Sequence, residues 1–249
     1  MLKKLFVVSI LSLVVSCTAF AADLPAAAGL SLDEVIGKLQ GNQQQIKDMY
    51  AETKTVIFSN MSMPGQQSKG PQKIEQRGKM WTKGEDKSKI EISSPMKQVT
   101  ITNGDKMAII NSDTGQKMIQ DLKKMRGQGA ADPGKMSLDK AKEFFNLSLK
   151  KDGDDYIVTG VPKKKNKFLG KMEFYVDSNQ WVPTKVNMYD LKGKLISQSN
   201  IKYQKVSGSW VPCSNNSVIN TPMGRMDVAM EFSNIKVNSG LSDKEFKIE

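Results

Sequence analysis

The sequence predicts a mainly β (α+β) protein: an open, strongly curved antiparallel sheet, a half β-barrel of about eleven strands, with helices covering its concave face. Short strand-like runs, separated by Gly, Pro, Asn and Asp, follow one another through most of the chain. Two stretches have helical periodicity. A sheet of so many strands has to curl. Its apolar face needs a cover, and two amphipathic helices are the candidates.

The N-terminal residues have the pattern of a secretion signal. An apolar run over residues 5–15 follows a basic start and is too short to span a bilayer. Ala19-Phe20-Ala21 fits a signal-peptidase site. We therefore expect a signal peptide over residues 1–21 and a single domain over residues 22–249.

A second cleavage site competes with the first. Val14-Val15-Ser16-Cys17 resembles a bacterial lipobox, and cleavage before Cys17 would leave a lipid-modified cysteine that anchors the protein to a membrane. Both routes take the chain out of the cytoplasm. The expected location is the periplasm, with a membrane-anchored lipoprotein as the alternative.

The first predicted helix covers residues 31–47. Ser31 and Glu34 form a capping box, in which each side chain bonds the other residue's backbone N–H. Leu32, Val35, Ile36 and Leu39 follow on one apolar stripe. A single stripe requires a single partner surface.

Strand-like runs follow the first helix, with a period of two. In the first half of the chain they cover residues 49–58, 74–82, 88–93, 98–102, 106–111 and 117–122. Asn103-Gly104 between two of these runs is a strong hairpin signal, because both residues tolerate positive φ. We therefore expect antiparallel neighbours.

The second predicted helix begins at Ser137, its N-cap, and ends at Phe145. Phe144 and Phe145 then lie on this helix, where they either pack in the core or line a lid over the sheet.

The second half of the chain repeats a pattern. After strand-like runs at 147–151, 156–161 and 170–177, the order turn, Trp-Val-Pro, strand, Gly turn, strand, Asn-Ile-Lys occurs twice, starting at Trp181 and at Trp210. Pro suits a strand start, where its missing N–H need not pair. We interpret the two copies as consecutive hairpins of one meander.

The composition excludes several classes of function. The chain has no histidine, so the commonest zinc ligand and any Ser-His-Asp or Cys-His catalytic arrangement are ruled out. It also lacks nucleotide-binding glycine motifs. We therefore predict no enzyme, no cofactor and no metal. Cys213 beside a proline is read as a packed residue.

The net charge of +11 favours an anionic partner: lipid headgroups, an acidic polymer or an acidic protein face. Its densest cluster is Lys163-Lys164-Lys165-Asn166-Lys167, which is more typical of a solvated loop than of a binding site. Nucleic acid is not expected, because basic and aromatic residues do not interleave.

A series of weak motifs resembles the LolA-like family of outer-membrane lipoprotein carriers and sorting proteins, over nearly the whole mature chain. The matching stretches are Gly78–Lys83, Lys89–Ile92, Pro95, Asn103–Lys106, Asp177–Gly193 and Leu241–Phe246. The resemblance implies a periplasmic half-barrel with a helical lid that shelters acyl chains. It also implies an acylated lipoprotein or lipid as cargo, an inner-membrane release complex or outer-membrane acceptor as partner, and a monomer.

The chain departs from the family at two places. Gly84 stands where the carrier has an arginine implicated in handing on its cargo. Met107, Ala108 and Ile109 replace the aromatic residues that follow the hairpin. Two alternatives therefore stay open: a periplasmic sensor or adaptor on the same fold that binds a protein partner, and a lipid-anchored acceptor if Cys17 is acylated.

The candidate cargo site consists of apolar residues on the strands and the second helix. The chain has 15 methionines, whose soft, unbranched side chains suit an adaptable apolar site or ordinary core packing. The predicted cavity residues are Val56, Phe58, Met80, Ile90, Ile92, Met107, Ile109, Met118, Phe144, Phe145, Phe174, Met188, Val228 and Met230.

Overall fold

In the computed structural model the described residues, 29–60, 70–126, 144–164 and 168–248, form one antiparallel sheet of thirteen strands. The predicted open, curved antiparallel sheet is confirmed, but with thirteen strands instead of about eleven, because each short run forms a strand of its own. The strands are β1 (Asp48–Ser59), β2 (Gln72–Lys83), β3 (Lys87–Ser94), β4 (Gln98–Asn103), β5 (Lys106–Asn111), β6 (Lys117–Asp121), β7 (Phe145–Asp152), β8 (Asp155–Pro162), β9 (Lys171–Asp177), β10 (Val182–Tyr189), β11 (Leu195–Val206), β12 (Ser209–Thr221) and β13 (Gly224–Val237).

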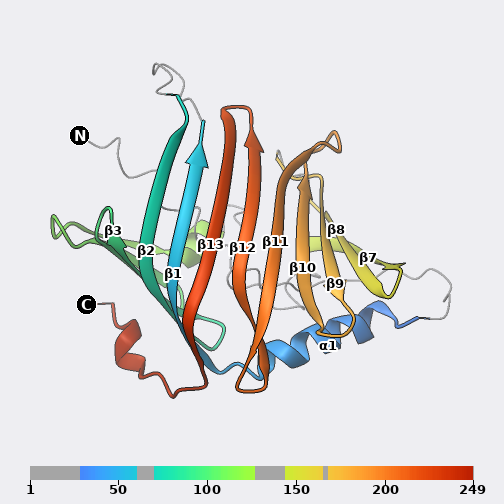
Figure 1. Cartoon of the computed structure of the whole chain (residues 1–249), viewed down its shortest axis with the longest axis horizontal. Helices are drawn as coiled ribbons and strands as arrows, with labels where there is room; N and C mark the ends of the chain where they lie inside the picture. The colour runs from blue at the N-terminus through green and yellow to red at the C-terminus, as the bar shows by residue number, and fades with distance from the viewer. Residues whose placement is uncertain (1–28, 61–69, 127–143, 165–167, 249) are drawn as a thin grey trace.

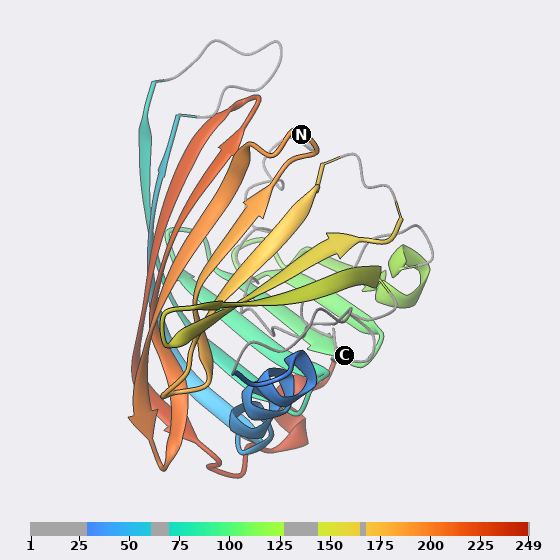
Figure 2. The ribbon, with the colours of Figure 1, turned by 90° about the vertical axis from the view of Figure 1, so that its right-hand side faces the viewer.

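The sheet is built from two meanders that meet in its middle. β1 pairs with β13, so the first and last strands of the chain are neighbours. From this pair the order runs outward through β2 to β6 on one side and through β12 to β7 on the other (Figure 1). Figure 2 shows the sheet curving so that its two wings approach each other on one side.

One helix, α1 (Leu32–Gln44), lies inside this curve (Figure 2). The predicted capping box is present: Ser31 Oγ accepts from the Glu34 backbone N–H, and Glu34 Oε2 accepts from the Ser31 N–H at 2.7 Å. The helix ends at Gln44, three residues earlier than the predicted 47.

The predicted apolar stripe of α1 is buried against one wing of the sheet. Leu32, Val35, Ile36 and Leu39 pack on Leu147, Tyr156, Val158 and Val176 of β7, β8 and β9. α1 therefore covers the concave face at β7–β9, as expected for a helix with a single stripe.

The second predicted helix lies largely outside the described residues. Its last residue, Phe145, is instead the first residue of β7, which corrects the prediction that Phe145 is helical. The physical reason is pairing: Phe145 aligns with Pro162 of β8, and strand pairing overrides the local helical pattern. A short helix, α2 (Leu122–Arg126), follows β6.

The two Trp-Val-Pro segments both produce a β-bulge. In each copy the residue after the proline, Thr184 or Cys213, has no partner in the ladder to the preceding strand, and the register shifts there. Proline cannot donate to the ladder, and a bulge next to it accommodates that loss while increasing the local twist. The repeated motif is thus a repeated bend at the entry of β10 and β12.

The same two segments hold α1 in place. Lys38 Nζ lies 4.8 Å from the ring centroid of Trp181. One helical turn later, Asn42 donates to the Trp210 carbonyl at 3.0 Å and accepts from the Trp210 N–H at 3.1 Å. The tryptophans are not equivalent in backbone, because Trp181 has φ 53° in the turn before β10 and Trp210 lies within β12.

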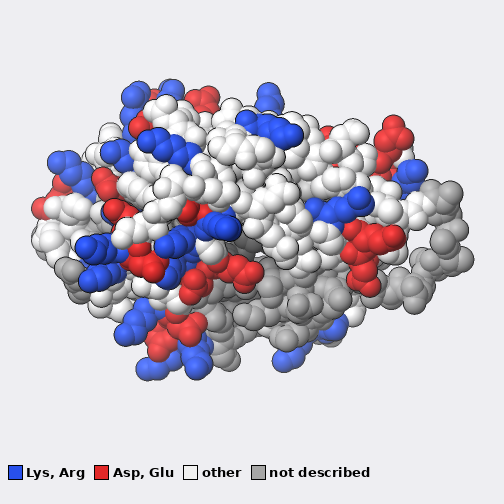
Figure 3. Space-filling view, turned by 90° about the horizontal axis from the view of Figure 1, so that it is seen from below, with Lys and Arg blue, Asp and Glu red and all other residues white. Residues whose placement is uncertain are grey.

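The C-terminal segment packs on the wing of the sheet opposite to the one that α1 covers. The 3₁₀-helix η2 (Asp243–Phe246) packs on β3 and β4, and Phe246 is fully buried. Asp243 pairs with Lys83 and Lys87, and Glu245 with Lys89. Seen from below, the described part of this end carries Lys and Arg next to Asp and Glu (Figure 3).

Candidate functional site

The sheet has an inner face, toward α1, and an outer face, toward η2. Side chains alternate between the two along each strand. On β1, Met49, Ala51 and Ile57 are buried on the inner side. Paired residues on adjacent strands share a face, so the strand register assigns the inner face on all the other strands. The inner face is the concave one (Figure 2).

All eight methionines within the described strands share the inner face. They are Met49, Met80, Met107, Met118, Met172, Met188, Met226 and Met230. Alternation without selection would put about half on each face. The concentration gives the inner face adaptable apolar side chains, among polar ones such as Thr55 and Gln76, because methionine fills irregular space with low rotational cost.

Eleven predicted site residues come together on the inner face. They are Met80, Ile90, Ile92, Met107, Ile109, Met118, Phe145, Phe174, Met188, Val228 and Met230. Met80 and Ile92 are buried, whereas most of the others keep partial exposure. The remaining three predicted residues lie elsewhere.

Val56 and Phe58 lie on the outer face, which corrects their assignment to the cavity. Because β1 directs Thr55 and Ile57 inward, their neighbours point outward. Phe58 is 49% exposed, with Lys73 Nζ 5.7 Å from its ring centroid. Phe144 precedes β7 and is 48% exposed.

Apolar packing divides the inner face into two main parts. One is the cluster beneath α1. The other joins Met49, Ala51, Met80, Val211, Phe232 and Val237. Met107 and Ile109 on β5, Met188 on β10 and Val228 on β13 belong to neither cluster and are only partly buried. These side chains form the apolar surface that a ligand could contact.

A polar strip crosses the centre of the inner face and was missed from the sequence. The hydroxyl oxygens of Ser199 (β11) and Ser217 (β12) are 2.7 Å apart, and Ser217 Oγ lies 3.2 Å from Asn215 Oδ1. Ser199 is 3% exposed. β12 carries polar residues on both faces here, so the alternation of apolar and polar residues could not indicate which of them point inward. The strip offers hydroxyl and amide groups between two apolar flanks.

The outer face of β9 and β10 carries a hydrogen-bonded network instead. Glu173 accepts from Lys171 at 2.6 Å and from the Tyr189 hydroxyl at 2.7 Å. Burial acts to raise the pKa of Glu173, but these hydrogen bonds outweigh it and the pKa is lowered. The carboxylate is therefore ionised at neutral pH. Lys185 Nζ lies 3.6 Å from the ring centroid of Tyr175, which extends the network.

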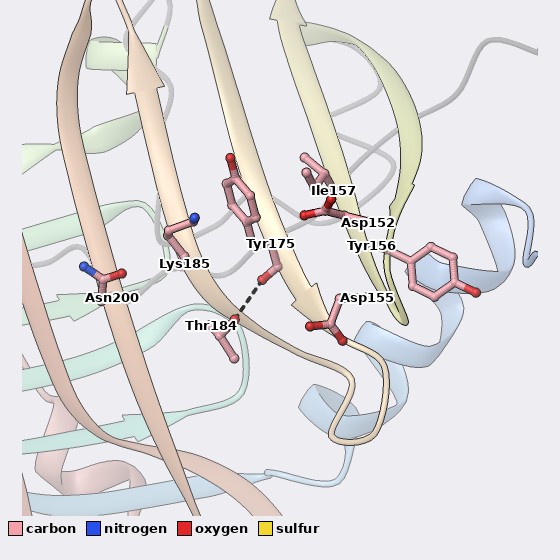
Figure 4. A pocket seen from close by; sticks show the side chains of 8 residues that line it. All are labelled: Asp152, Asp155, Tyr156, Ile157, Tyr175, Thr184, Lys185 and Asn200. Carbon is pink, nitrogen blue, oxygen red and sulfur yellow. Dashed lines mark hydrogen bonds between the residues drawn. The ribbon is translucent and has the colours of Figure 1, made fainter.

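Two open pockets lie on the outer face. The first, of about 380 Å³, lies at β8–β11 and is lined by Asp152, Asp155, Tyr156, Ile157, Tyr175, Thr184, Lys185 and Asn200. Figure 4 shows Thr184 on β10 bonded to the Tyr175 carbonyl on β9, at 3.4 Å, with Lys185 beside Thr184 and Asn200 on β11. Its lining is mixed in charge and polar, so it offers no apolar shelter.

The second pocket, of about 670 Å³, lies where β1, β2 and β13 meet the C-terminal segment. Tyr50 and Trp81 form an aromatic pair there, with ring centroids 5.4 Å apart. Glu52 and Lys236 complete the lining from the neighbouring positions. This pocket combines exposed aromatic surface with charged groups.

The described residues contain no group of three or more His, Cys, Asp or Glu side chains placed to hold a metal ion. Cys213 is free and half-buried. Among the helices that the structure describes, none has the length and apolar character needed to cross a bilayer.

Comparison with known proteins identifies the fold. A family model described as an uncharacterized protein matches residues 136–249, and no curated protein matches the chain. A DUF1329 family protein from Desulfovibrio piger superposes with a TM-score of 0.61 at 17% identity, covering 87% of this chain and 97% of its own.

Two further structures carry the lipoprotein-sorting fold. A putative outer membrane lipoprotein-sorting protein domain from Vibrio parahaemolyticus has a TM-score of 0.60 at 14% identity, covering 86% of this chain and 95% of its own. A LolA superfamily protein from Nitrosomonas europaea has a TM-score of 0.56 at 15% identity, covering 88% and 99%. The fold resemblance expected from the sequence is thereby confirmed.

Proposed function

We propose that this chain, which has the fold of the LolA superfamily, is a periplasmic carrier that shelters the acyl chains of a lipoprotein or lipid on the inner face of its sheet. The single observation that carries the proposal is the placement of all eight strand methionines on that face. A surface that accepts and releases flexible chains needs adaptable side chains more than a fixed shape.

The energetics favour acyl chains as the ligand. Transferring an acyl chain out of water is worth about 0.8 kcal/mol per methylene, or roughly 12 kcal/mol for a chain of about 16 carbons. Association costs about 4–15 kcal/mol in lost freedom. One chain therefore gives modest affinity, and a cargo with two or three chains gives the tight but reversible binding that a carrier needs.

The polar strip suits the other part of such a cargo. Ester and amide groups join acyl chains to a headgroup, and these groups need hydrogen-bonding partners once water is removed. Ser217 and Asn215 lie between the apolar flanks, where such linkages would sit. The location that follows is the periplasm, reached by removal of residues 1–21. Proposed partners are a release complex at the inner membrane and an acceptor at the outer membrane.

The deciding experiment is native mass spectrometry of protein purified from the periplasm, followed by organic extraction. We expect a bound lipid or acylated peptide at one molecule per chain, and its mass names the cargo class. An empty protein that also ignores an added lipid-modified peptide would exclude the carrier.

A sensor or adaptor on the same fold is the second candidate. The observation that favours it is the outer-face pocket at Tyr50 and Trp81, whose aromatic and charged lining fits a peptide better than an acyl chain. The chain also has Gly84, with φ 58°, where the family's carrier has its arginine. A specific protein captured by the wild type but not by a Trp81→Ala variant, with no lipid in the protein, would favour this reading.

The third candidate function is a lipid-anchored acceptor of the cargo, which requires acylation of Cys17. The mass of the mature N-terminus decides it, because an acylated Cys17 and a free Ala22 differ by hundreds of daltons.

A further inference from the structure

Nine large apolar side chains of the described residues are more than a third exposed, and four of them lie just outside the strands at one end of β7 to β13. Phe144, Phe168, Leu191 and Met223 are 48%, 77%, 63% and 46% exposed. They lie before β7 and in the turns β8–β9, β10–β11 and β12–β13, which by the antiparallel order fall at the strand ends where β10 and β12 finish. For β10 to β13 this is the upper end in Figure 1, while β7 and β8 slope away from it in Figure 2.

Backbone contacts join the segment before β7, the β8–β9 turn and the β10–β11 turn. The Lys163 N–H donates to the Phe144 carbonyl at 2.8 Å, and the Gly170 N–H to the Tyr189 carbonyl at 2.8 Å. A Cβ at Gly170 would collide with the Asp190 carbonyl, so the β8–β9 and β10–β11 turns are in close contact. Phe168 and Leu191 therefore belong to adjacent turns.

The same turns are basic. Lys163, Lys164, Lys192 and Lys194 are exposed beside the apolar side chains. Within the described residues, none of these four lysines forms an ion pair. The neighbouring Asp190 carboxylate accepts the N–H groups of Lys192 and Lys194, so it shapes the turn. We call these four lysines with Phe144, Phe168, Leu191 and Met223 the upper rim.

The opposite end differs in its apolar side chains and in the acidic residues of its turns. Its turns carry Glu85, Asp86, Asp105 and Asp154. Its lysines Lys83, Lys87 and Lys89 pair with η2, and Phe246 there is buried. Within the described residues, exposed apolar tips next to lysines without an ion pair thus occur at one end of the strands, whereas no exposed large apolar side chain lies in the turns of the other end.

We propose that the upper rim docks the protein on an anionic phospholipid surface. An amphipathic edge of this kind buries its apolar side chains at the headgroup boundary while its lysines approach the lipid phosphates. Each lysine near such a surface strengthens binding about fivefold. An acidic protein surface would pair with the lysines but would not explain the four exposed apolar side chains, so the bilayer is favoured.

This inference does not depend on the cargo, although it agrees with a carrier. α1 lies toward the lower end of the sheet (Figure 1), so docking through the upper rim would turn toward the membrane the end of the inner face that α1 does not cover. Docking and acyl binding are measured separately, so one proposal can fail without the other.

The test is cosedimentation of the full chain, carrying Cys17→Ser so that no lipid anchor contributes, with vesicles. One set is phosphatidylcholine alone, and the other is an equal mixture of phosphatidylcholine and phosphatidylglycerol. We expect binding to the mixed vesicles that weakens as salt increases. Lys163→Gln/Lys164→Gln should lower the partition constant about 20-fold, and Phe168→Ser about tenfold.

The matched control is Lys244→Gln/Lys247→Gln, which makes the same charge change on exposed residues at the lower end. It should lower binding less than threefold. Phe168→Ser should keep the wild-type melting temperature, since the side chain is 77% exposed. Absence of binding to mixed vesicles, equal losses for the two double variants, or capture of an acidic protein without vesicle binding would overturn the proposal.

Discussion

At the scale of single residues, the alternation along each strand decides which side chains can meet a ligand. Val56 and Phe58 were grouped with the cavity because they are apolar, yet one position separates them from Ile57 and puts them on the outer face. A shift of one residue in a strand changes the face. The sequence shows the apolar character of a residue, while the register decides its side.

The same logic predicts the effect of one methionine. Met230→Gln on the inner face should weaken binding of a lipid-modified peptide about tenfold, because the amide must lose its water to contact an acyl chain. Glu231→Gln, the next residue on the outer face, is the matched control and should leave the affinity unchanged. Fluorescence titration measures both. Equal affinities for the two variants would exclude Met230 from the site.

A glycine in the sheet gives a residue-scale prediction about stability. A Cβ at Gly78 would collide with the backbone carbonyl of Glu91, so Gly78→Ala should destabilise the protein by about 1–3 kcal/mol. Gly37 on α1 has open space around it, and Gly37→Ala should stabilise by about 0.5–1 kcal/mol. Urea unfolding measures both. Destabilisation by both alanines would show that the space at Gly78 is not the cause.

At the scale of elements, the C-terminal segment is held to the sheet by the burial of Phe246 and by the ion pairs of Asp243 and Glu245. The hydrogen bond from Lys87, and then that from Lys83, lowers the pKa of Asp243. A carboxylate whose pKa is lower in the folded state stabilises the fold at pH values above its ordinary pKa of about 3.9. That contribution is lost as the pH falls through the pKa of the folded state. The ion pairs of Asp243 are therefore fully formed at neutral pH and weaken below about pH 4.

Hydrogen exchange at the Lys247 amide, which bonds the Lys244 carbonyl, reports this directly. Protection should fall below pH 4, and Asp243→Asn should show reduced protection already at pH 7. Asp86→Asn in the β2–β3 turn is the control and should behave as the wild type. If Asp243→Asn retains full protection, the ion pairs of Asp243 do not contribute to the attachment.

At the scale of the whole molecule, the described residues cover the inner face only in part. α1 packs on β7–β9, so an acyl ligand on the remaining inner face would add burial that the free protein lacks. Ligand at about 100 times its dissociation constant should stabilise the protein by about 2.7 kcal/mol. For a chain of this size that raises the melting temperature by about 5–10 °C.

Thermal unfolding with a diacyl lipid, and with its headgroup alone as control, checks this prediction. The headgroup should give no shift. A lipid that leaves the melting temperature unchanged would mean that the inner face does not bind acyl chains.

Much of the fold follows from local signals that the sequence carries in full. The capping box at Ser31 starts α1, the Gly turns separate the strands, and alternation marks an apolar face on β13. These features depend on neighbours along the chain, so the sequence by itself determined the element order and the antiparallel class. The two Trp-Val-Pro motifs likewise indicated two repeated hairpins.

The tertiary structure decided what depends on residues far apart in the chain. Only the β1–β13 pairing brings the two meanders into one sheet, and only the full register puts eight methionines on a single face. Phe145 became a strand residue because Pro162 offered it a partner. The Ser199–Ser217 strip and the upper rim arise in the same way, from neighbours that meet in space, and no pattern along one strand could have predicted them.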